Sequence, residues 1–248
     1  MEILSKCPVC GGDEGISVLE FKNRKKYIVC RCGCAYLNPR KTDAEISEYY
    51  SSGEYRKMTE EFIEDKSEVE HQERRAEIVS GMVDKFDIMS HLDIGCSTGT
   101  LLRRVEEGKG RGFVSAGVDP DPKWTKDVKV LYRSLEEVKG KYDLITMIHV
   151  LEHMNRPREV LEKVSKLLSP GGVLVIEVPN RRAYMVAFNS PQHVVAFDLA
   201  SLGKLVMSTG YEILAHLLHG WLMNLPLDLY ITIIATNDKA KCQDRYNE

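Results

Sequence analysis

The stretch HLDIGCSTGTLL, residues 91–102, decides the fold of this chain. A short apolar strand leads into the small residues Gly95, Ser97 and Gly99, and an apolar helix follows. Small residues at such a turn let the backbone approach a ligand closely and let the helix pack on the strand. The stretch predicts a ligand-binding turn of an α/β sheet, with a tight structural turn that binds nothing as the alternative.

An aspartate at the end of the next strand favours the prediction of a ligand-binding turn. The strand FVSAGV, residues 113–118, ends at Asp119, twenty residues after Gly99. A carboxylate at that place can accept hydrogen bonds from both ribose hydroxyls. Asp93, at the end of the first strand, would repel a pyrophosphate but suits an ammonium group. The two acids predict a nucleoside ligand other than a dinucleotide.

Strands and helices alternate from residue 90 onward, which is typical of a parallel sheet with helices on both faces. The expected strands are 91–94, 113–118, 128–132, 142–148 and 173–178, and the expected helices are 100–107, 158–168 and 199–208. Residues 211–218 and 225–235 are expected to pair as an antiparallel hairpin at the sheet edge. Residues 42–85 are expected to be helical with a break near 51–53.

Composition limits the class of protein. The 248 residues carry a formal net charge of −3, and 43% of them are hydrophobic. We expect a soluble globular protein without the overall basic field that attracts nucleic acid. The N-terminus lacks a signal-peptide pattern, and apolar runs fall short of the roughly 20 residues of a membrane helix. We expect a cytoplasmic protein with no membrane partner.

Four motifs together resemble the class I S-adenosylmethionine-dependent methyltransferases. Their first motif, (D/E)-x-G-x-G-x-G, is matched by Asp93, Gly95, Ser97 and Gly99, with serine in place of the middle glycine. GVDPDP at 117–122 looks like the second motif, and LYRSLEEV at 131–138 occupies the adenine-contacting place. Residues 142–180, which include Leu151-Glu152-His153, are similar to ubiquinone-biosynthesis-like methyltransferases. The resemblance covers about residues 75–215.

The resemblance implies a Rossmann-like seven-stranded sheet with an antiparallel edge strand and S-adenosylmethionine as cofactor. It places Asp93 and Gly95 at the methionine moiety, Asp119 at the ribose, and Ser134 with Leu135 at the adenine. The full set expected at the cofactor is Asp93, Gly95, Cys96, Ser97, Gly99, Asp119, Pro120, Ser134, Leu135, His149 and Tyr50. Cys96 is interpreted as a small packing residue rather than a nucleophile.

The candidate catalytic residues are His149, Glu152, His153 and His193, near the carboxyl ends of strands where such sheets bind ligands. Methyl transfer is an in-line displacement, so the protein mainly positions the partners and takes a proton from the acceptor where needed. Either His149 or His193 is the hypothetical general base. The alternatives are that His149 lines the cofactor pocket and that Glu152 and His153 brace a turn.

Tyr49 and Tyr50 lie in EISEYYSSGEYR, residues 45–56. This segment resembles one that folds over the cofactor in related enzymes. The alternative is an amphipathic helix that buries two rings. Residues 41–89 are therefore expected to form a helical connector or cofactor lid.

Five of the seven cysteines lie within the first 34 residues, which suggests a metal site rather than disulfides. CPVCGG, residues 7–12, has the spacing at which two thiolates reach one tetrahedral zinc. A second knuckle follows irregularly as Cys30-x-Cys32-x-Cys34. The expected Zn²⁺ ligands are Cys7, Cys10, Cys30 and Cys32, with Cys34 as the alternate, and residues 1–40 are expected to form a zinc ribbon. The alternative is a set of free buried thiols.

The basic residues of 22–31 could bind a substrate phosphate or nucleic acid, or form a solvated hairpin tip. They are Lys22, Arg24, Lys25, Lys26 and Arg31. With residues 90–238 as the methyltransferase domain, the function expected is methyl transfer to a small molecule, a nucleotide-linked sugar or a quinone-like metabolite. The rivals are an RNA or protein methyltransferase that grips its substrate with the ribbon, and a catalytically silent partner subunit. The oligomeric state stays open.

Overall fold

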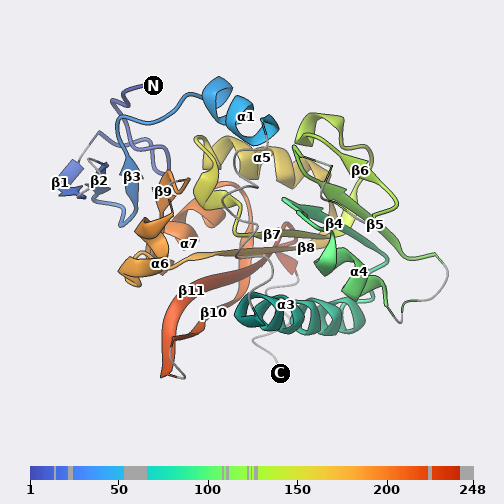
Figure 1. The fold of residues 1–248 in the computed structure, drawn as a ribbon. Helices are drawn as coiled ribbons and strands as arrows, with labels where there is room; N and C mark the ends of the chain where they lie inside the picture. The colour runs from blue at the N-terminus through green and yellow to red at the C-terminus, as the bar shows by residue number, and fades with distance from the viewer. Residues whose placement is uncertain are drawn as a thin grey trace.

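The computed structural model describes residues 1–13, 15–21, 25–52, 66–107, 109, 112–121, 123, 125, 128–190, 192–222 and 225–240. Within these residues the strands form one sheet of seven strands and one of four. The larger sheet forms the centre of the molecule, and the smaller sheet lies at one end of it (Figure 1).

The seven-stranded sheet confirms the expected α/β class. Its order is β10-β11-β8-β7-β4-β5-β6. The bounds are β4 Ser90–Ile94, β5 Val114–Val118, β6 Leu131–Tyr132, β7 Tyr142–Ile148, β8 Leu168–Pro179, β10 Glu212–Leu222 and β11 Leu225–Thr236. β4 to β8 pair in parallel, whereas β11 pairs antiparallel with both β8 and β10. The antiparallel strand β11 is therefore second from the edge of the sheet, between β10 and β8.

Helices cover both faces of this sheet because buried residues alternate along the strands. Val173 and Val175 of β8 pack with α3 (Lys66–Lys85) and α4 (Thr100–Glu106). Leu174 and Ile176 point the other way, toward the cluster that contains α5 (Pro157–Leu167) and α7 (Leu199–Ser208). Figure 1 shows α3 below the sheet and α5 above it.

Several element boundaries differ from the sequence expectations. The strand expected at 128–132 is only the two residues of β6, and β8 begins five residues before the expected 173. In β8 the extra residues include Gly171, whose φ of 72° lies in the left-handed region that glycine favours. The expected break in the first helical region separates α1 (Asp43–Ser51) from α3, and residues 53–65 between them lie outside the described residues. A capping box between Thr42 and Glu45 begins α1.

The four-stranded sheet has the order β1-β2-β3-β9. The N-terminal cysteine-rich segment contributes three of its strands, β1 (Gly15–Glu20), β2 (Lys26–Cys30) and β3 (Ala35–Leu37). The fourth strand, β9 (Val195–Ala196), comes from much later in the sequence. Ala35 pairs with Ala196, and the Leu37 amide donates to the Val194 carbonyl at 2.8 Å. Figure 1 shows β3 and β9 side by side. The N-terminal hairpin and the larger domain therefore share a sheet.

The remaining short elements are α6 (Tyr184–Asn189) and the one-turn helices η2 (Leu135–Glu137) and η3 (Leu151–His153). Among the helices the structure describes, none combines the length and the apolar composition needed to cross a bilayer.

Candidate active site

The turn after β4 adopts a backbone that glycine favours. Gly95 has a φ of +77°, and its amide and that of Cys96 both donate to the Val118 carbonyl, at 2.7 and 3.1 Å. A Cβ added at Gly95 would lie 2.4 Å from Cγ2 of Val150, so the close approach requires glycine. Ser97 also has a left-handed backbone, with a φ of +50°, although serine replaces the glycine of the motif. The glycine turn, residues 95–99, thus packs directly against the segment that follows β7.

Asp119 holds the glycine turn from the neighbouring strand end. Its Oδ2 accepts from the Ser97 amide and its Oδ1 from the Asp121 amide, both at 2.9 Å. Cys96 is buried, and burial raises the pKa of its thiol, so the thiol stays protonated. Its Sγ fills the space beside Gly117, where an added Cβ would lie only 2.5 Å away. This packing accords with the structural interpretation of Cys96.

Asp93 is a buried carboxyl beside the same turn. The Thr146 hydroxyl donates to Oδ1 of Asp93 at 2.6 Å, and Nε2 of His91 lies 2.9 Å from that hydroxyl. Burial raises the pKa of Asp93 to about 7, and the nearby Asp119 raises it too, against the Thr146 hydrogen bond. No cationic side chain in the described residues forms an ion pair with it. Sequence reasoning missed His91 and Thr146, although a polar residue inside an apolar strand was the available signal.

The other expected cofactor residues lie on separate elements. Ser134 precedes η2, Leu135 begins it, and both are half-buried, whereas Pro120 is exposed. Tyr50 is on α1 with its ring edge-on to Tyr49, 5.6 Å between centroids. The contacts of these residues with a cofactor stay predictions.

His149 follows β7 with a φ of +54°, a backbone region that histidine seldom occupies. Its Nε2 lies 2.7 Å from Nη2 of Arg75, and its Nδ1 lies 3.3 Å from Oε1 of Glu152. Burial lowers the pKa of His149, whereas hydrogen bonds to Glu152 and Glu177 raise it, to about 9. A carboxylate can only accept, so the contact with Glu152 requires a proton on Nδ1, while Nε2 lies between Nη2 of Arg75 and Oε1 of Glu177, which is 3.2 Å away. His149 therefore donates from Nδ1 to Glu152.

Arg75 and Glu177 form a buried ion pair beside His149 that sequence reasoning missed. Nε of Arg75 donates to Oε1 of Glu177 at 2.8 Å, and the Thr232 hydroxyl donates to Oε2 at 3.2 Å. The signal in the sequence was a single glutamate inside the otherwise apolar strand VLVIEVP. The pair connects α3 to the carboxyl ends of the central strands.

Glu152, His153 and His193 form a second group, here called the carboxylate–histidine cluster. One carboxylate oxygen and one ring nitrogen from each histidine lie within 4.8 Å of one another. Burial raises the pKa of Glu152, but the hydrogen bond from His149 and the nearby histidines lower it to about 2. Burial lowers the pKa of His153, and that of His193 to about 4. The cluster therefore holds one charged carboxylate and two neutral imidazoles near pH 7.

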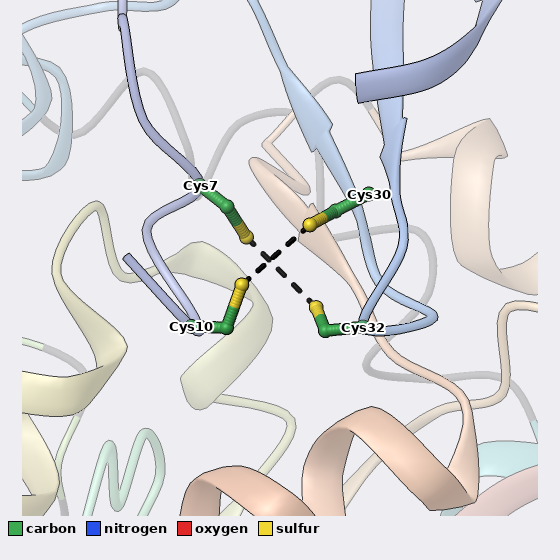
Figure 2. Close-up of side chains that lie close together, drawn as sticks. All are labelled: Cys7, Cys10, Cys30 and Cys32. Carbon is green, nitrogen blue, oxygen red and sulfur yellow. Dashed lines mark hydrogen bonds between the residues drawn. The ribbon is translucent and has the colours of Figure 1, made fainter. Parts of the chain in front are cut away.

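The expected zinc ligands converge in space. The Sγ atoms of Cys7, Cys10, Cys30 and Cys32, here called the thiol cluster, all lie within 4.8 Å of one another. Figure 2 shows these side chains pointing toward a common centre, with 3.6 Å between Cys10 and Cys30 and 4.0 Å between Cys7 and Cys32. A Zn–S bond of about 2.3 Å in a tetrahedron separates sulfurs by roughly 3.8 Å, which these distances bracket. Sγ of the alternate Cys34 is also close, 3.4 Å from that of Cys7.

The basic segment is partly engaged within the protein. Nζ of Lys25 donates to the Ser190 carbonyl at 3.0 Å, and Lys26 forms an ion pair with Glu20. Lys22 and Arg24 lie outside the described residues. The phosphate or nucleic-acid role of this segment stays a prediction.

The sheet order, with the glycine turn after β4 and the acid after β5, defines an α/β protein of the doubly wound class. The sequence model of the methyltransferase-domain family matches residues 69–216, more than half of the chain, and the chain belongs to this family.

Solved structures of methyltransferases share the fold. The plantazolicin methyltransferase BpumL, in complex with a monoazolic desmethylPZN analog and SAH, has a TM-score of 0.60 and 16% identity over 78% of this chain and 94% of that chain. The magnesium protoporphyrin IX methyltransferase (ChlM) from Synechocystis PCC 6803 with bound SAH has a TM-score of 0.58 and 14% identity, over 79% and 99%. At these identities the likeness concerns the fold.

Curated relatives match a shorter region. The ubiquinone biosynthesis O-methyltransferase of Pseudomonas aeruginosa (strain LESB58) is 28% identical over 121 residues, 42% of this chain and 51% of that protein. The mitochondrial ubiquinone biosynthesis O-methyltransferase of Saccharomyces cerevisiae (strain ATCC 204508 / S288c) is 28% identical over 141 residues, 51% of this chain and 44% of that protein. The chain spans about half the length of these relatives.

Proposed function

We propose that the chain transfers the methyl group of S-adenosylmethionine to a small-molecule acceptor, a nucleotide-linked sugar or a quinone-like ring. Family membership and the SAH-bound structural neighbours support the cofactor. S-adenosylmethionine supplies a methyl group that is already activated on a sulfonium. The work left to the protein is to hold the two partners in line and to exclude water.

The observation that carries the proposal is the buried carboxyl of Asp93 beside the glycine turn. It has only the Thr146 hydroxyl and a neighbouring acid, so its ionised form is uncompensated in the protein alone. The α-ammonium of the cofactor's methionine end would supply the missing positive charge. Asp119, with its two oxygens fixed by backbone amides, is preorganised to accept from ribose hydroxyls.

On the acceptor side, the geometry favours His193 over His149. Nδ1 of His149 donates to Glu152, and its Nε2 contacts both Arg75 and Glu177, so neither ring nitrogen is open to an acceptor molecule. His193 is neutral and donates from Nδ1 to the Ala187 carbonyl at 2.9 Å. We therefore propose that the acceptor binds beside Nε2 of His193.

The thiol cluster fits a structural zinc ion. Its four sulfurs bracket the tetrahedral spacing, and the thiolates of Cys7, Cys10, Cys30 and Cys32 would complete four-coordination without an open position. A zinc ion at this place supplies folding free energy to a short segment with little core of its own.

Isothermal calorimetry with S-adenosylmethionine, SAH and NAD tests the cofactor assignment. The two sulfur nucleosides are expected to bind and NAD is not, and Asp119→Ala is expected to lose binding. Asp228→Ala, an exposed aspartate on β11, is the matched control and should bind normally. Binding of NAD alone, or of none of the three, would overturn the proposal.

Metal analysis of two serine variants tests the zinc assignment. Cys10→Ser is expected to abolish zinc at the thiol cluster, whereas Cys34→Ser is expected to retain it. The reverse result would exchange the roles of Cys34 and Cys10. Retention of zinc in both variants would argue against this ligand set.

A further inference from the structure

The tautomers of two histidines are fixed by backbone carbonyls. Nδ1 of His153 lies 3.2 Å from the Gln192 carbonyl oxygen, and Nδ1 of His193 lies 2.9 Å from that of Ala187. A carbonyl oxygen can only accept, so each Nδ1 must carry the proton. Each Nε2 is then left with a lone pair and no hydrogen.

Both of these lone-pair atoms face the same carboxylate. Nε2 of His153 lies 3.8 Å from Oε1 of Glu152, and Nε2 of His193 lies 3.9 Å from it. The other oxygen, Oε2, is buried and has no hydrogen-bond partner in the described residues. No lysine or arginine of the described residues forms an ion pair with Glu152. The lone pairs of the two imidazoles thus converge on Oε1 of Glu152, and neither ring donates a proton to it.

We propose that Glu152, His153 and His193 bind a divalent transition-metal ion. Metal–ligand bonds of about 2.1 Å separate neighbouring ligand atoms by roughly 3.0–3.4 Å, so a small closure of the observed distances completes the site. Two imidazoles and one carboxylate favour zinc, iron, manganese or cobalt over calcium and magnesium, which prefer oxygen ligands. Three protein ligands leave coordination positions open, as in sites that bind a further molecule.

The three proposed ligands form the hydrogen bonds to neighbouring groups that metal ligands usually form. Ligating histidines commonly donate their second ring N–H to a backbone carbonyl, which fixes the ring and its tautomer, and both histidines do so here. Ligating carboxylates are in turn hydrogen-bonded, and Oε1 of Glu152 accepts from Nδ1 of His149. The Glu152 carbonyl also accepts from the Val194 amide at 2.9 Å, which joins the η3 segment to the chain beside His193.

This site rests on the proposed function at one point, because an acceptor beside Nε2 of His193 would bind at an open coordination position of the ion. Cofactor binding at the glycine turn requires no metal. It is also distinct from the thiol cluster, which offers four sulfurs and no open position. The two sites are separable by spectroscopy, since Co²⁺ bound to thiolates gives intense sulfur-to-metal charge-transfer bands. Co²⁺ bound by nitrogen and oxygen gives only weak visible bands.

The test is to titrate the full chain with Co²⁺ and to count bound metal by mass spectrometry. Two equivalents per chain are expected, one with the thiolate bands and one without. A single equivalent, with thiolate bands only, would overturn the inference. This measurement on the unaltered chain decides the question even where variants fold poorly.

Variants then assign the second equivalent. His153→Gln and His193→Gln are each expected to weaken its affinity by more than about 100-fold while keeping the thiolate bands. His216→Gln, an exposed histidine on β10, is the matched control and should keep both ions. Retention of both ions in the His153 and His193 variants would overturn the inference.

Cofactor calorimetry on the same samples keeps this test separate from that of the proposed function. Two bound metal ions without S-adenosylmethionine binding would sustain the metal site and remove the proposed function. One metal ion, bound at the thiol cluster, with normal S-adenosylmethionine binding would remove the second metal site and sustain the proposed function.

Discussion

Asp93 and Glu152 are two buried carboxyls near the carboxyl ends of neighbouring strands, and their pKa values move in opposite directions. Asp93 has one hydroxyl partner and a neighbouring acid, and burial raises its pKa to about 7. Glu152 is as deeply buried, yet the hydrogen bond from His149 and the adjacent histidines lower its pKa to about 2. The difference lies in the neighbours, because burial acts on both in the same direction.

Asp93 and Glu152 differ in whether they need a ligand to balance their charge. Asp93 has no positive partner in the described residues, so its ionised form requires one from outside. Glu152 is charged in the protein alone, and its charge is available to attract a cation. The first site is thus suited to a ligand that brings a positive group, and the second to a metal ion that binds to preformed donors.

Neutralising Asp93 should give the largest effect. Asp93→Asn is expected to weaken S-adenosylmethionine binding by more than about 100-fold, because the ammonium loses its partner. At pH 8 the free energy of unfolding of this variant should exceed that of the unaltered chain by on the order of 2–4 kcal/mol, since each pKa unit corresponds to roughly 1.4 kcal/mol. Calorimetry and urea denaturation measure the two effects.

The sign of this stability change follows from the raised pKa of Asp93. In the folded protein the neutral carboxyl is favoured, so stability is greatest below the unfolded pKa and is lost as pH rises toward 7. The gain from Asp93→Asn should therefore vanish near pH 4. Asp228→Asn is the control, and a destabilised Asp93→Asn at pH 8 would contradict the comparison.

Neutralising Glu152 should act in the opposite direction. Glu152→Gln is expected to lower the free energy of unfolding by about 3 kcal/mol at pH 7, because the charged carboxylate is stabilised by His149. With a lowered pKa, this contribution is present above the unfolded pKa and is lost as pH falls below about 4.5 toward 2. Urea denaturation over this range measures it. A stabilised Glu152→Gln would remove the contrast with Asp93.

The pH dependence of cofactor binding sharpens the same contrast. Between pH 5 and 7, the dissociation constant for SAH should rise about tenfold for each unit of decreasing pH, because Asp93 must lose a proton to pair with the ammonium. Calorimetry in buffers of different ionisation enthalpy should show proton release on binding. Asp93→Asn should show neither effect, and a flat profile in the unaltered chain would refute the assignment of Asp93.

The smallest effect concerns how the carboxylate–histidine cluster is held. The buried Tyr27 hydroxyl donates to the His193 carbonyl at 2.6 Å. Tyr27→Phe is expected to cost about 1 kcal/mol of stability and to weaken Co²⁺ binding at the cluster severalfold. Tyr211→Phe, which removes a comparable buried hydrogen bond to Leu161, is the control and should affect stability alone. Equal Co²⁺ affinity in the two variants would show that Tyr27 does not position His193.

The sequence predicts the central sheet and the glycine turn well because local signals specify them. β7 and α7 have the expected bounds, and the period-2 and helical patterns that predicted them need no distant partner. β6 and the start of β8 differ, since strand length there depends on pairing with neighbours that local patterns do not encode.

The candidate site was predictable only where a motif names its residues. Asp93, Gly95 and Asp119 follow from motif spacing, and the structure brings them together at one turn. Arg75 and Glu177 were not found, because α3 and β8 meet only after folding. The convergence of His153 and His193 on Glu152 likewise depends on a contact across about 40 residues, which sequence spacing does not reveal.

The pairing of β3 with β9 has a consequence for how this chain can be divided. A cut after residue 40, at the predicted boundary of the ribbon, would leave Val195 and Ala196 as an unpaired edge two residues beyond His193. It would also uncover the ring of Phe188, against which Tyr27 packs at 5.0 Å. Because of these contacts, recombination could not replace the N-terminal segment with that of another protein without disrupting the rest of the chain. A replacement would have to supply a matching strand edge as well as its cysteines.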